Sequence, residues 1–427
     1  MPRFLHVADV HLGFDRYDSK ERTKDFFYAF EDVLKRYAIA PTPNAEGILS
    51  SVDFVVVAGD LFEHRTIQPN ILNQAKICFQ MLKEHHIPAI AIEGNHDNRP
   101  YGTQTNWIKY LANDDLLILL EPERSPDGAV IYELWDGEAG GYIDLDCGVR
   151  ILGSQWYGAS APRAIESLAQ AMDRLPPSPG HTVMLFHHGL EGQIARYQGA
   201  LKYSDLLPLK EAGVDYLGLG HIHKSYVEEN WVFNPGSIEA NSIEEANYDR
   251  GAFLVELSAQ GVRAELKTDY LQRSLVRLKL KATGIESAQQ IEADAIALIH
   301  SAIHSKKLNP AVQPMVELKI EGTVGFDRFE LDLKKLQQEL KTISGALIFL
   351  LKYEVDALEY ATPLADDASR LQIEHEVFTD LLAANTTYKK RATDLAKGLI
   401  DLKELQLEAR SEIELYEFAE KLIEQGS

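Results

Sequence analysis

The sequence has few cysteines, an excess of acidic over basic residues and no long hydrophobic run. Its 427 residues include only Cys78 and Cys147, too few and too far apart for a disulfide framework or a Cys-x-x-Cys metal motif. We therefore expect both thiols to be reduced. No apolar run approaches the roughly 18 residues of a membrane span, and the chain enters a predicted strand without a signal-type segment. These absences predict a cytoplasmic protein with no membrane partner.

Positive charge is also scarce. Lys and Arg number 43 against 65 Asp and Glu, which gives a formal net charge of -22. This balance argues against a surface coated with basic residues for nucleic-acid binding. It does not exclude a nucleic-acid substrate, because bound divalent metals and a local basic patch reverse the sign of the charge at one site. With 45% hydrophobic and 25% charged residues, the composition is that of a soluble globular protein of two or three domains.

The alternation of strand and helix patterns divides the chain into four parts. Residues 1–271 read as an α/β domain, with segments 116–120, 129–135, 142–146 and 149–154 indicating a second sheet packed on the first. Residues 272–355 read as a small α+β domain and 356–370 as a linker. Residues 371–427 have a helical pattern with many apolar residues. Such a segment either folds back on its own domain or docks on a partner.

Five fragments at the ends of predicted strands carry residues of metal-ligand type. Gly59-Asp60 closes the apolar run 54–58, which reads as a buried parallel strand. The other fragments are Asp9-Val10-His11, Gly94-Asn95-His96-Asp97, His187-His188-Gly189 and Gly220-His221-Ile222-His223. Because ligands in open α/β sheets sit at the carboxyl ends of the strands, we expect these fragments to converge, with Asp60 bridging two metal ions.

The expected ligands are all nitrogen or oxygen donors: Asp9, His11, Asp60, Asn95, His187, His221 and His223. This set suits manganese, iron or zinc in a catalytic site better than a structural zinc site. Of the two adjacent histidines, His187 is the expected ligand because it lies directly at the strand end. Two metals bridged by one carboxylate activate water and clamp the oxygens of a phosphoester. The pattern therefore predicts metal-assisted phosphoester hydrolysis.

Other polar residues flank the expected ligands. His96 is placed to protonate the leaving oxygen, and Asp97 is placed to hold its ring in one tautomer. His64, Arg65 and Arg99 follow the strand ends on loops. They fit either contacts with a substrate phosphate or an ordinary solvated loop. Neither a P-loop nor a nucleophile elbow occurs in the sequence.

Taken in order, the five fragments resemble the motifs of the calcineurin-like metallophosphoesterase superfamily. Within it, the stretches 8–13, Gly59-Asp60-Leu61-Phe62 and Asn234-Pro235-Gly236-Ser237 resemble the SbcD-type and meiotic-recombination nucleases of DNA double-strand-break repair. The resemblance implies a two-sheet αββα sandwich over 1–271 and a capping, DNA-binding domain over 272–355. It also implies that the tail, 371–427, docks on an SMC-like ATPase.

The same resemblance implies roles for single residues. It assigns one metal to Asp9, His11 and His223, the other to Asn95, His187 and His221, and the bridge to Asp60. His96 is the implied acid, oriented by Asp97. The family uses two Mn²⁺ ions, degrades DNA ends as an exonuclease and cuts single strands as an endonuclease. It commonly dimerises through helices here expected at about 70–86 and 103–112. One departure is the loop Glu63-His64-Arg65-Thr66-Ile67-Gln68-Pro69, where the family more often has Ser-x-Pro.

Other functions stay open beside a DNA repair nuclease. The same superfamily contains phosphoesterases that act on nucleotides or cyclic phosphates, and protein phosphatases. The extra α+β domain favours DNA, because a small substrate needs no second wall along a duplex. A scaffold without activity is disfavoured because the full ligand set is present. The acidic net charge is consistent with a DNA substrate if a partner ATPase supplies most of the DNA affinity.

Overall fold

The computed structural model of the chain describes residues 1–44, 46–103, 105–126, 128–194, 199–327, 330–357, 369–383, 388, 391–407 and 410–424. The chain divides into two compact units, Met1–Leu275 and Val276–Ser427. None of the helices in the described ranges is long and apolar enough to cross a membrane.

The first sheet of the Met1–Leu275 unit is mostly parallel. Its strands, from one edge to the other, are β16 (Gly261–Lys267), β15 (Ala252–Ser258), β1 (Arg3–Val7), β4 (Phe54–Ala58), β5 (Ala89–Ile92) and β6 (Ile118–Leu119). β1, β4, β5 and β6 run parallel, whereas β15 is antiparallel to both of its neighbours. The four parallel strands therefore present their carboxyl ends at one edge of the sheet.

The second sheet has the same character. Its strands in order are β13 (Tyr226–Glu228), β14 (Val232–Asn234), β12 (Tyr216–Gly220), β11 (His181–His187), β10 (Val149–Leu152) and β9 (Tyr142–Leu145). The four central strands of this order, from β14 to β10, are parallel, and the two outer strands are antiparallel to them. Every residue of β10 and β12 is buried, as expected for strands that are covered on both faces.

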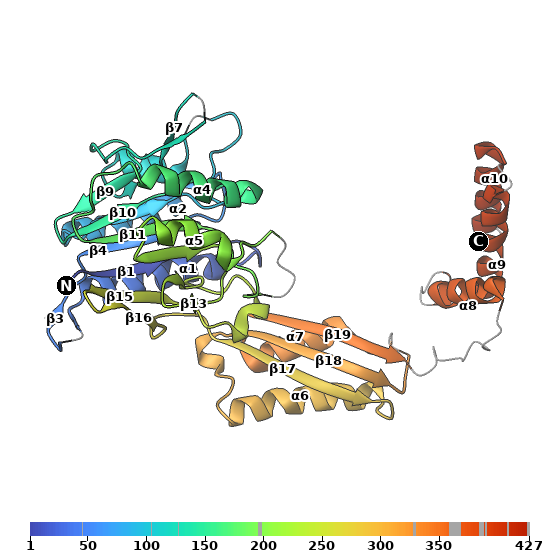
Figure 1. The fold of residues 1–427 in the computed structure, drawn as a ribbon. Helices are drawn as coiled ribbons and strands as arrows, with labels where there is room; N and C mark the ends of the chain where they lie inside the picture. The colour runs from blue at the N-terminus through green and yellow to red at the C-terminus, as the bar shows by residue number, and fades with distance from the viewer. Residues whose placement is uncertain are drawn as a thin grey trace. The chain divides into compact units, whose positions relative to one another are not determined.

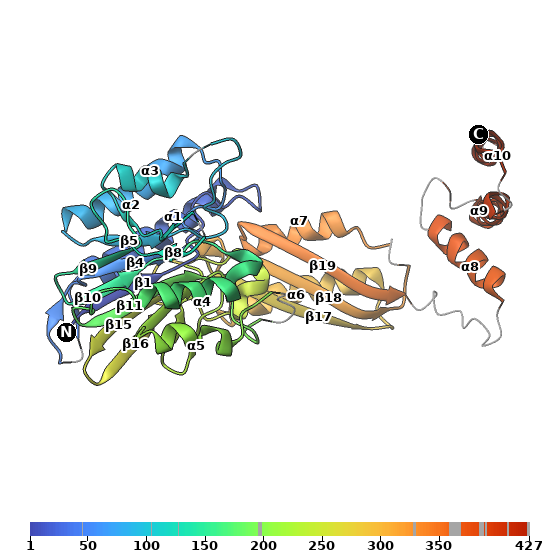
Figure 2. The ribbon, with the colours of Figure 1, turned by 45° about the horizontal axis from the view of Figure 1, so that its top comes forward.

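Helices cover the outer faces of both sheets (Figures 1 and 2). α1 (Lys20–Val33), α2 (Pro69–Glu84) and α3 (Trp107–Asn113) pack on the first sheet, and α4 (Ala161–Met172) and α5 (Tyr203–Glu211) pack on the second. A third core lies between the sheets. There Phe4 stacks on Phe54 with ring centroids 4.8 Å apart, and Tyr216 stacks on Phe233 at 4.4 Å. The predicted αββα sandwich is confirmed.

Of the four segments expected in the second sheet, one lies elsewhere and another, 129–135, joins it only through a bridge from Leu134 to Tyr142 of β9. β6, from the segment 116–120, pairs with β5 and extends the first sheet. β8 (Val130–Ile131) pairs with β7 (Glu123–Arg124) in a separate ribbon. Apolar patterning identifies strands but not their partners, which explains this error. Short elements complete the unit: a π-helical extension at Leu34–Ile39, a ribbon of β2 (Thr42–Pro43) and β3 (Leu49–Ser50), and 3-10 turns at Gly158–Ser160 and Ile243–Asn247.

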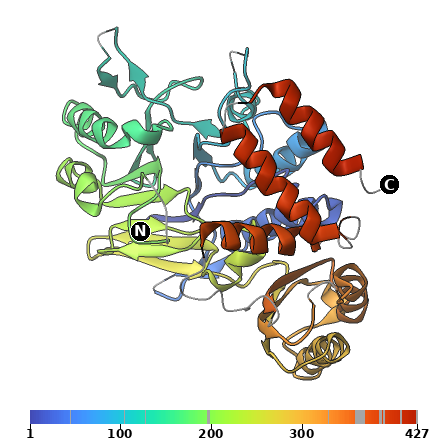
Figure 3. The ribbon, with the colours of Figure 1, turned by 90° about the vertical axis from the view of Figure 1, so that its right-hand side faces the viewer.

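The Val276–Ser427 unit begins with a three-stranded sheet, in the order β17 (Leu275–Thr283), β18 (Met315–Val324) and β19 (Ile348–Ala357). α6 (Ala288–His304) and α7 (Leu333–Ser344) share its apolar core and lie on the same side of the sheet (Figure 3). A 3-10 turn at Pro310–Val312 precedes β18. α8 (Arg370–Ala383), α9 (Ala392–Leu407) and α10 (Glu412–Glu424) follow. Most of the predicted linker, 358–368, lies outside the described residues.

Candidate metal centre

Loops from both sheets of the sandwich meet at the carboxyl ends of five parallel strands. β1 leads into Asp9 and His11, β4 into Asp60, β5 into Asn95, β11 ends at His187, and β12 leads into His221 and His223. The donor atoms form two groups, Asp9–His11–His223 and Asp60–His187–His221, and within each group they lie within 4.8 Å of one another. The backbone N–H of His221 donates to the Asp9 carboxylate at 2.9 Å, which joins the groups. The structure thus brings the predicted ligands together.

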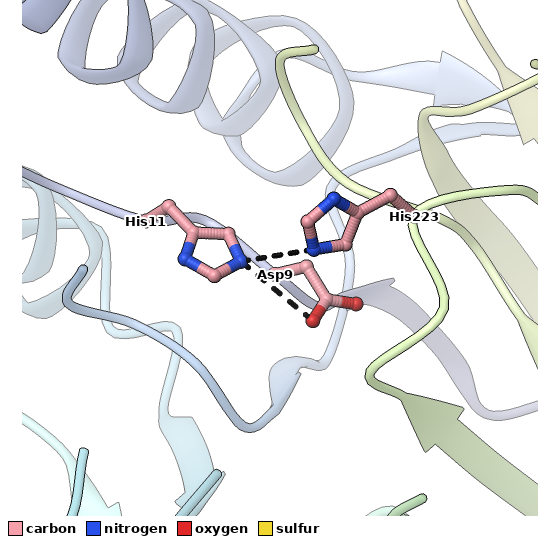
Figure 4. A group of neighbouring side chains, drawn as sticks. All are labelled: Asp9, His11 and His223. Carbon is pink, nitrogen blue, oxygen red and sulfur yellow. Dashed lines mark hydrogen bonds and ion pairs between the residues drawn. The ribbon is translucent and has the colours of Figure 1, made fainter. Parts of the chain in front are cut away.

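In the Asp9–His11–His223 group the two imidazoles face each other (Figure 4). Nε2 of His11 lies 3.1 Å from Nε2 of His223 and 4.0 Å from Oδ1 of Asp9. The outer nitrogens lie beside carboxylates: His11 Nδ1 is 2.8 Å from Oε2 of Glu63, and His223 Nδ1 is 3.1 Å from Oε1 of Glu245. The His223 contact is a hydrogen bond, whereas the His11 contact has the distance of an ion pair without hydrogen-bond angles.

The second group shows the same convergence. His187 Nδ1 lies 2.7 Å from the carbonyl oxygen of Ala58, so this nitrogen carries the proton and donates it. Its Nε2 lies 3.2 Å from both Oδ2 of Asp60 and Oδ1 of Asn95, and it would present a lone pair to a metal ion that displaces its proton. The Asn95 oxygen also lies 2.8 Å from Nδ1 of His221. Electron-rich atoms this close repel one another unless a cation lies among them, so the residues present fit divalent metal ions.

The backbone at this site adopts a costly conformation. Asp9 (φ 50°), His11 (φ 50°), Asp60 (φ 53°) and His221 (φ 86°) all have positive φ angles. The left-handed region is disfavoured for residues other than glycine, by about 1 kcal/mol or more each, and such strain gathers at functional sites. These positive φ angles turn the donor side chains of the loops toward one point.

The charged groups of the site shift one another's pKa values. Burial alone would raise the pKa of Asp60, but the charge and hydrogen bond of His187 outweigh it and hold this pKa below its ordinary value. Burial lowers the pKa of His187, but Asp60 overcomes that effect and raises it to about 9. For His223 burial is likewise overcome, chiefly by Glu245, and the pKa is raised to about 9. Without metal, both imidazoles therefore hold a proton at neutral pH, which an incoming metal displaces.

The structure changes the predicted role of Asp97. The His96 ring is held by the backbone carbonyl of Glu63, 2.7 Å from its Nδ1. The buried Asp97 carboxylate instead accepts backbone N–H groups from Leu61, Phe62 and Gly94 at 3.0–3.2 Å. It therefore ties the loop after β4 to the loop after β5. Sequence adjacency suggested that Asp97 orients His96, but the His96 ring bonds to the carbonyl of Glu63 instead.

The three predicted substrate-binding residues are on exposed loops. His64 Nε2 lies 3.1 Å from Oδ1 of Asp15, and the carbonyl of Arg65 accepts the indole N–H of Trp107 at 3.0 Å. Arg99 is exposed beyond the loop of Asn95. His188, the alternative to His187, is buried against the backbone carbonyls of Gly189 and Gly158.

Sequence reasoning missed the roles of three residues beside the donors: Trp156, Glu245, and Glu63, whose carboxylate lies 2.8 Å from His11. Trp156 stacks on His188 with ring centroids 5.6 Å apart and lies 5.1 Å from His221. Glu245 contacts His223 from a 3-10 turn, where nothing in the local pattern sets it apart from the adjacent Glu244. The nearest sequence feature that marked the loop of Glu245 was the upstream turn Gly236-Ser237.

Comparisons with known proteins agree with this geometry. The family model for calcineurin-like phosphoesterases matches residues 2–225, more than half of the chain. The DNA double-strand break repair protein Mre11 of Archaeoglobus fulgidus is 28% identical over 255 residues, 57% of this chain and 52% of its own length. Mre11 of Saccharolobus solfataricus is 25% identical over 420 residues, 94% of each chain. The uncharacterized metallophosphoesterase YhaO of Bacillus subtilis is 26% identical over 271 residues, 62% of this chain and 59% of its own.

The chain belongs to the calcineurin-like phosphoesterase family. It spans about half the length of the Archaeoglobus relative and nearly all of the Saccharolobus one. The family membership and the two donor groups identify it as a metal-dependent hydrolase. Among such hydrolases, it is similar to proteins named for DNA double-strand break repair.

Proposed function

We propose that the protein is a two-metal phosphodiesterase that hydrolyses DNA in repair, as an exonuclease on duplex ends and an endonuclease on single strands. The observation that carries the proposal is the pair of adjoining donor groups in a chain similar to a double-strand break repair protein over 94% of its length. Divalent metals bound there, in this proposal Mn²⁺, supply the positive charge that activates water and neutralises the phosphodiester.

The donors divide between two metal sites that share Asp60. Asp9, His11 and His223 would hold one ion, and Asn95, His187 and His221 would hold the other. The Asp60 carboxylate suits a bridge because Oδ2 faces His187 while Oδ1 accepts the backbone N–H of His96 at 2.8 Å, which fixes its plane. His64, Arg65 and Arg99 are proposed contacts for the substrate phosphates.

His96 is the proposed proton donor. Because its Nδ1–H donates to the Glu63 carbonyl, a second proton on Nε2 gives the imidazolium form. That proton can then pass to the leaving oxygen as the phosphoester bond breaks. The His96 ring stands edge-on to that of His11, with centroids 4.9 Å apart, which places it beside the metal ligands. Asp97 supports this arrangement indirectly, through the loops that it joins.

Partners are proposed for the remaining parts. The α+β domain, 272–355, caps and binds DNA, and the helical tail, 371–427, docks on an SMC-like ATPase. Exposed apolar residues on α8 and α10, including Leu381 at 65% and Ile413 at 72%, support a docking role. On α2, Ile77 is 50% exposed, which supports a homodimer through this helix.

The test measures Mn²⁺-dependent cleavage of labelled linear duplex and single-stranded DNA, with a chromogenic phosphodiester in parallel. Asp60→Ala and His96→Ala are compared with wild type. His181→Ala is the matched control, because His181 begins β11 at the end opposite to His187. We expect DNA cleavage in wild type and the control, and loss in both site variants.

Other outcomes discriminate between functions. Cleavage of the small diester with intact DNA, unchanged after the ATPase partner is added, would identify a phosphoesterase for nucleotides or cyclic phosphates. DNA cleavage that appears only with the partner would support a nuclease that depends on it. Equal activity of wild type and Asp60→Ala would contradict the metal site itself.

A further inference from the structure

The two metal sites differ in what lies behind their imidazoles. In the Asp9–His11–His223 site, each Nε2 faces inward and each Nδ1 lies beside a carboxylate, Glu63 at 2.8 Å and Glu245 at 3.1 Å. Both carboxylates are largely enclosed, with side chains 16% and 13% exposed. In the other site the Nδ1 of His187 donates to a neutral carbonyl, that of Ala58.

The Glu245 carboxylate is fixed by a hydrogen bond of its own, whereas Glu63 is held through its backbone. Oε2 of Glu245 accepts the backbone N–H of Asn241 at 2.8 Å, and the Glu245 carbonyl accepts Nη1 of Arg250 at 3.0 Å. The Glu63 N–H donates to the carbonyl of Leu12 at 3.0 Å, and its own carbonyl holds His96. The Glu245 side chain is therefore already ordered, and the backbone of Glu63 places its carboxylate beside His11.

A carboxylate behind an imidazole has two effects on a metal. It fixes the tautomer and the ring plane, and it raises the basicity of the nitrogen that faces the ion. It also adds negative charge close to a divalent cation, in a partly buried place where screening is weak. A backbone carbonyl gives the first effect but adds no net charge. Asp60 serves both sites, so it does not distinguish them.

We propose that Glu63 and Glu245 are positioning residues that make the Asp9–His11–His223 site the tighter of the two metal sites. The inference rests on the proposed two-metal function and deepens it, because it orders the filling of the sites. The first ion would be held firmly by the Asp9 group, and the second would exchange.

The test uses metal-free full-length protein titrated with Mn²⁺ alone, followed by calorimetry and by tryptophan fluorescence. Trp156 lies 5.1 Å from the ring of His221 and 5.7 Å from that of His187, so quenching by Mn²⁺ reports the second site. Trp156→Phe identifies its share of the signal. We expect two affinity classes in wild type, with most of the Trp156 quenching in the weaker class.

The variants separate charge from orientation. Glu63→Gln and Glu245→Gln keep an oxygen acceptor and lose the charge, and each should weaken the tight class by about 10- to 100-fold. His187→Ala should remove the weak class and leave the tight one. Glu244→Gln is the matched control, since Glu244 precedes Glu245 in the same turn but is exposed; it should leave both classes unchanged.

Several results would overturn the inference. One is a single affinity class in wild type. Another is a tight class whose affinity is unchanged in both glutamine variants. A third is Trp156 quenching that is complete before the weaker class of sites fills. Loss of tight binding in His96→Ala would make Glu63 a direct ligand together with His96, since their donor atoms and that of His11 lie within 4.8 Å. Unequal sites in a protein that never cleaves DNA would refute the nuclease proposal and leave this inference intact.

Discussion

Replacing Gly94 by alanine should damage the metal centre although no candidate ligand is replaced. A Cβ at Gly94 would lie 2.7 Å from Cγ of Asp60 and closer still to its backbone nitrogen and Oδ1. Ordinary van der Waals contact begins at 3.4 Å, so Asp60 would have to retreat by about 1 Å, and part of the obstacle is backbone. A displacement of that size in a catalytic group costs about 100-fold in rate. Because Asp60 is the proposed bridge between the two sites, binding of both metals should weaken as well.

The assay is Mn²⁺-dependent turnover of a chromogenic phosphodiester, with a metal titration of the same samples. Gly218→Ala is the matched control, because it makes the same change in β12 at an ordinary φ, where the nearest atoms are side-chain atoms of Leu185 and His6 at 3.1 and 3.2 Å. Those side chains can yield, so kcat should stay within a few-fold of wild type. Wild-type turnover and metal affinity in Gly94→Ala would refute the reasoning.

Three further predictions concern pH, metal removal and DNA. Burial lowers the pKa of His6 to about 3, so below pH 6.5 the unfolded chain binds a proton that the folded chain does not. In urea unfolding, the stability of wild type relative to His6→Asn should therefore be about 1.4 kcal/mol lower at pH 5.5 than at 7.5; this comparison cancels the opposite contributions of His187 and His223. Chelation should lower stability by about 2.7 kcal/mol relative to Mn²⁺ at 100 times its Kd; coinciding thermal melts would contradict metal binding. The isolated chain should bind duplex weakly, and tight, strongly salt-dependent binding in a filter assay would contradict the need for a partner.

The last of these predictions follows from how the basic residues are paired. On the face of the β17–β18–β19 sheet opposite its helices, Glu317 lies 2.8 Å from both Arg277 and Lys352. Lys319 pairs with Glu321 at 2.9 Å and with Glu354 at 2.8 Å. These cations are offset by nearby acids and add little net attraction for phosphates.

The clustering of the candidate ligands could be predicted because each of them follows a buried strand. The apolar run before Asp60 and the one before His187 identify strands, and the carboxyl ends of parallel strands meet at one edge. Ligand type and strand end were sufficient, even though His187 and Asp60 come from different sheets. The sheet that each strand joins was harder to predict, because the sequence of β6 does not show whether it pairs with β5 or with β9.

The residues behind the ligands could not be predicted. Glu245 reaches His223 across 22 residues, and Glu63 reaches His11 across 52, through loops whose course no periodicity describes. The positive φ angles of Asp9 and Asp60 are equally hidden, because neither residue is a glycine. Such features are imposed by tertiary contacts, and local patterns carry no trace of them.

The carboxylates of the centre also assemble the loops that carry them. Asp9 accepts the N–H of His221, Asp60 accepts that of His96, and Asp97 accepts three more. These charge-assisted bonds stabilise strained loops before any cation arrives, and they link β1 to β12 and β4 to β5. A carboxylate held by backbone N–H groups is already in place for a metal ion. The loops of the site are therefore held in place by these hydrogen bonds. The proposed difference in metal affinity then depends on the side chains behind the ligands, Glu63 and Glu245.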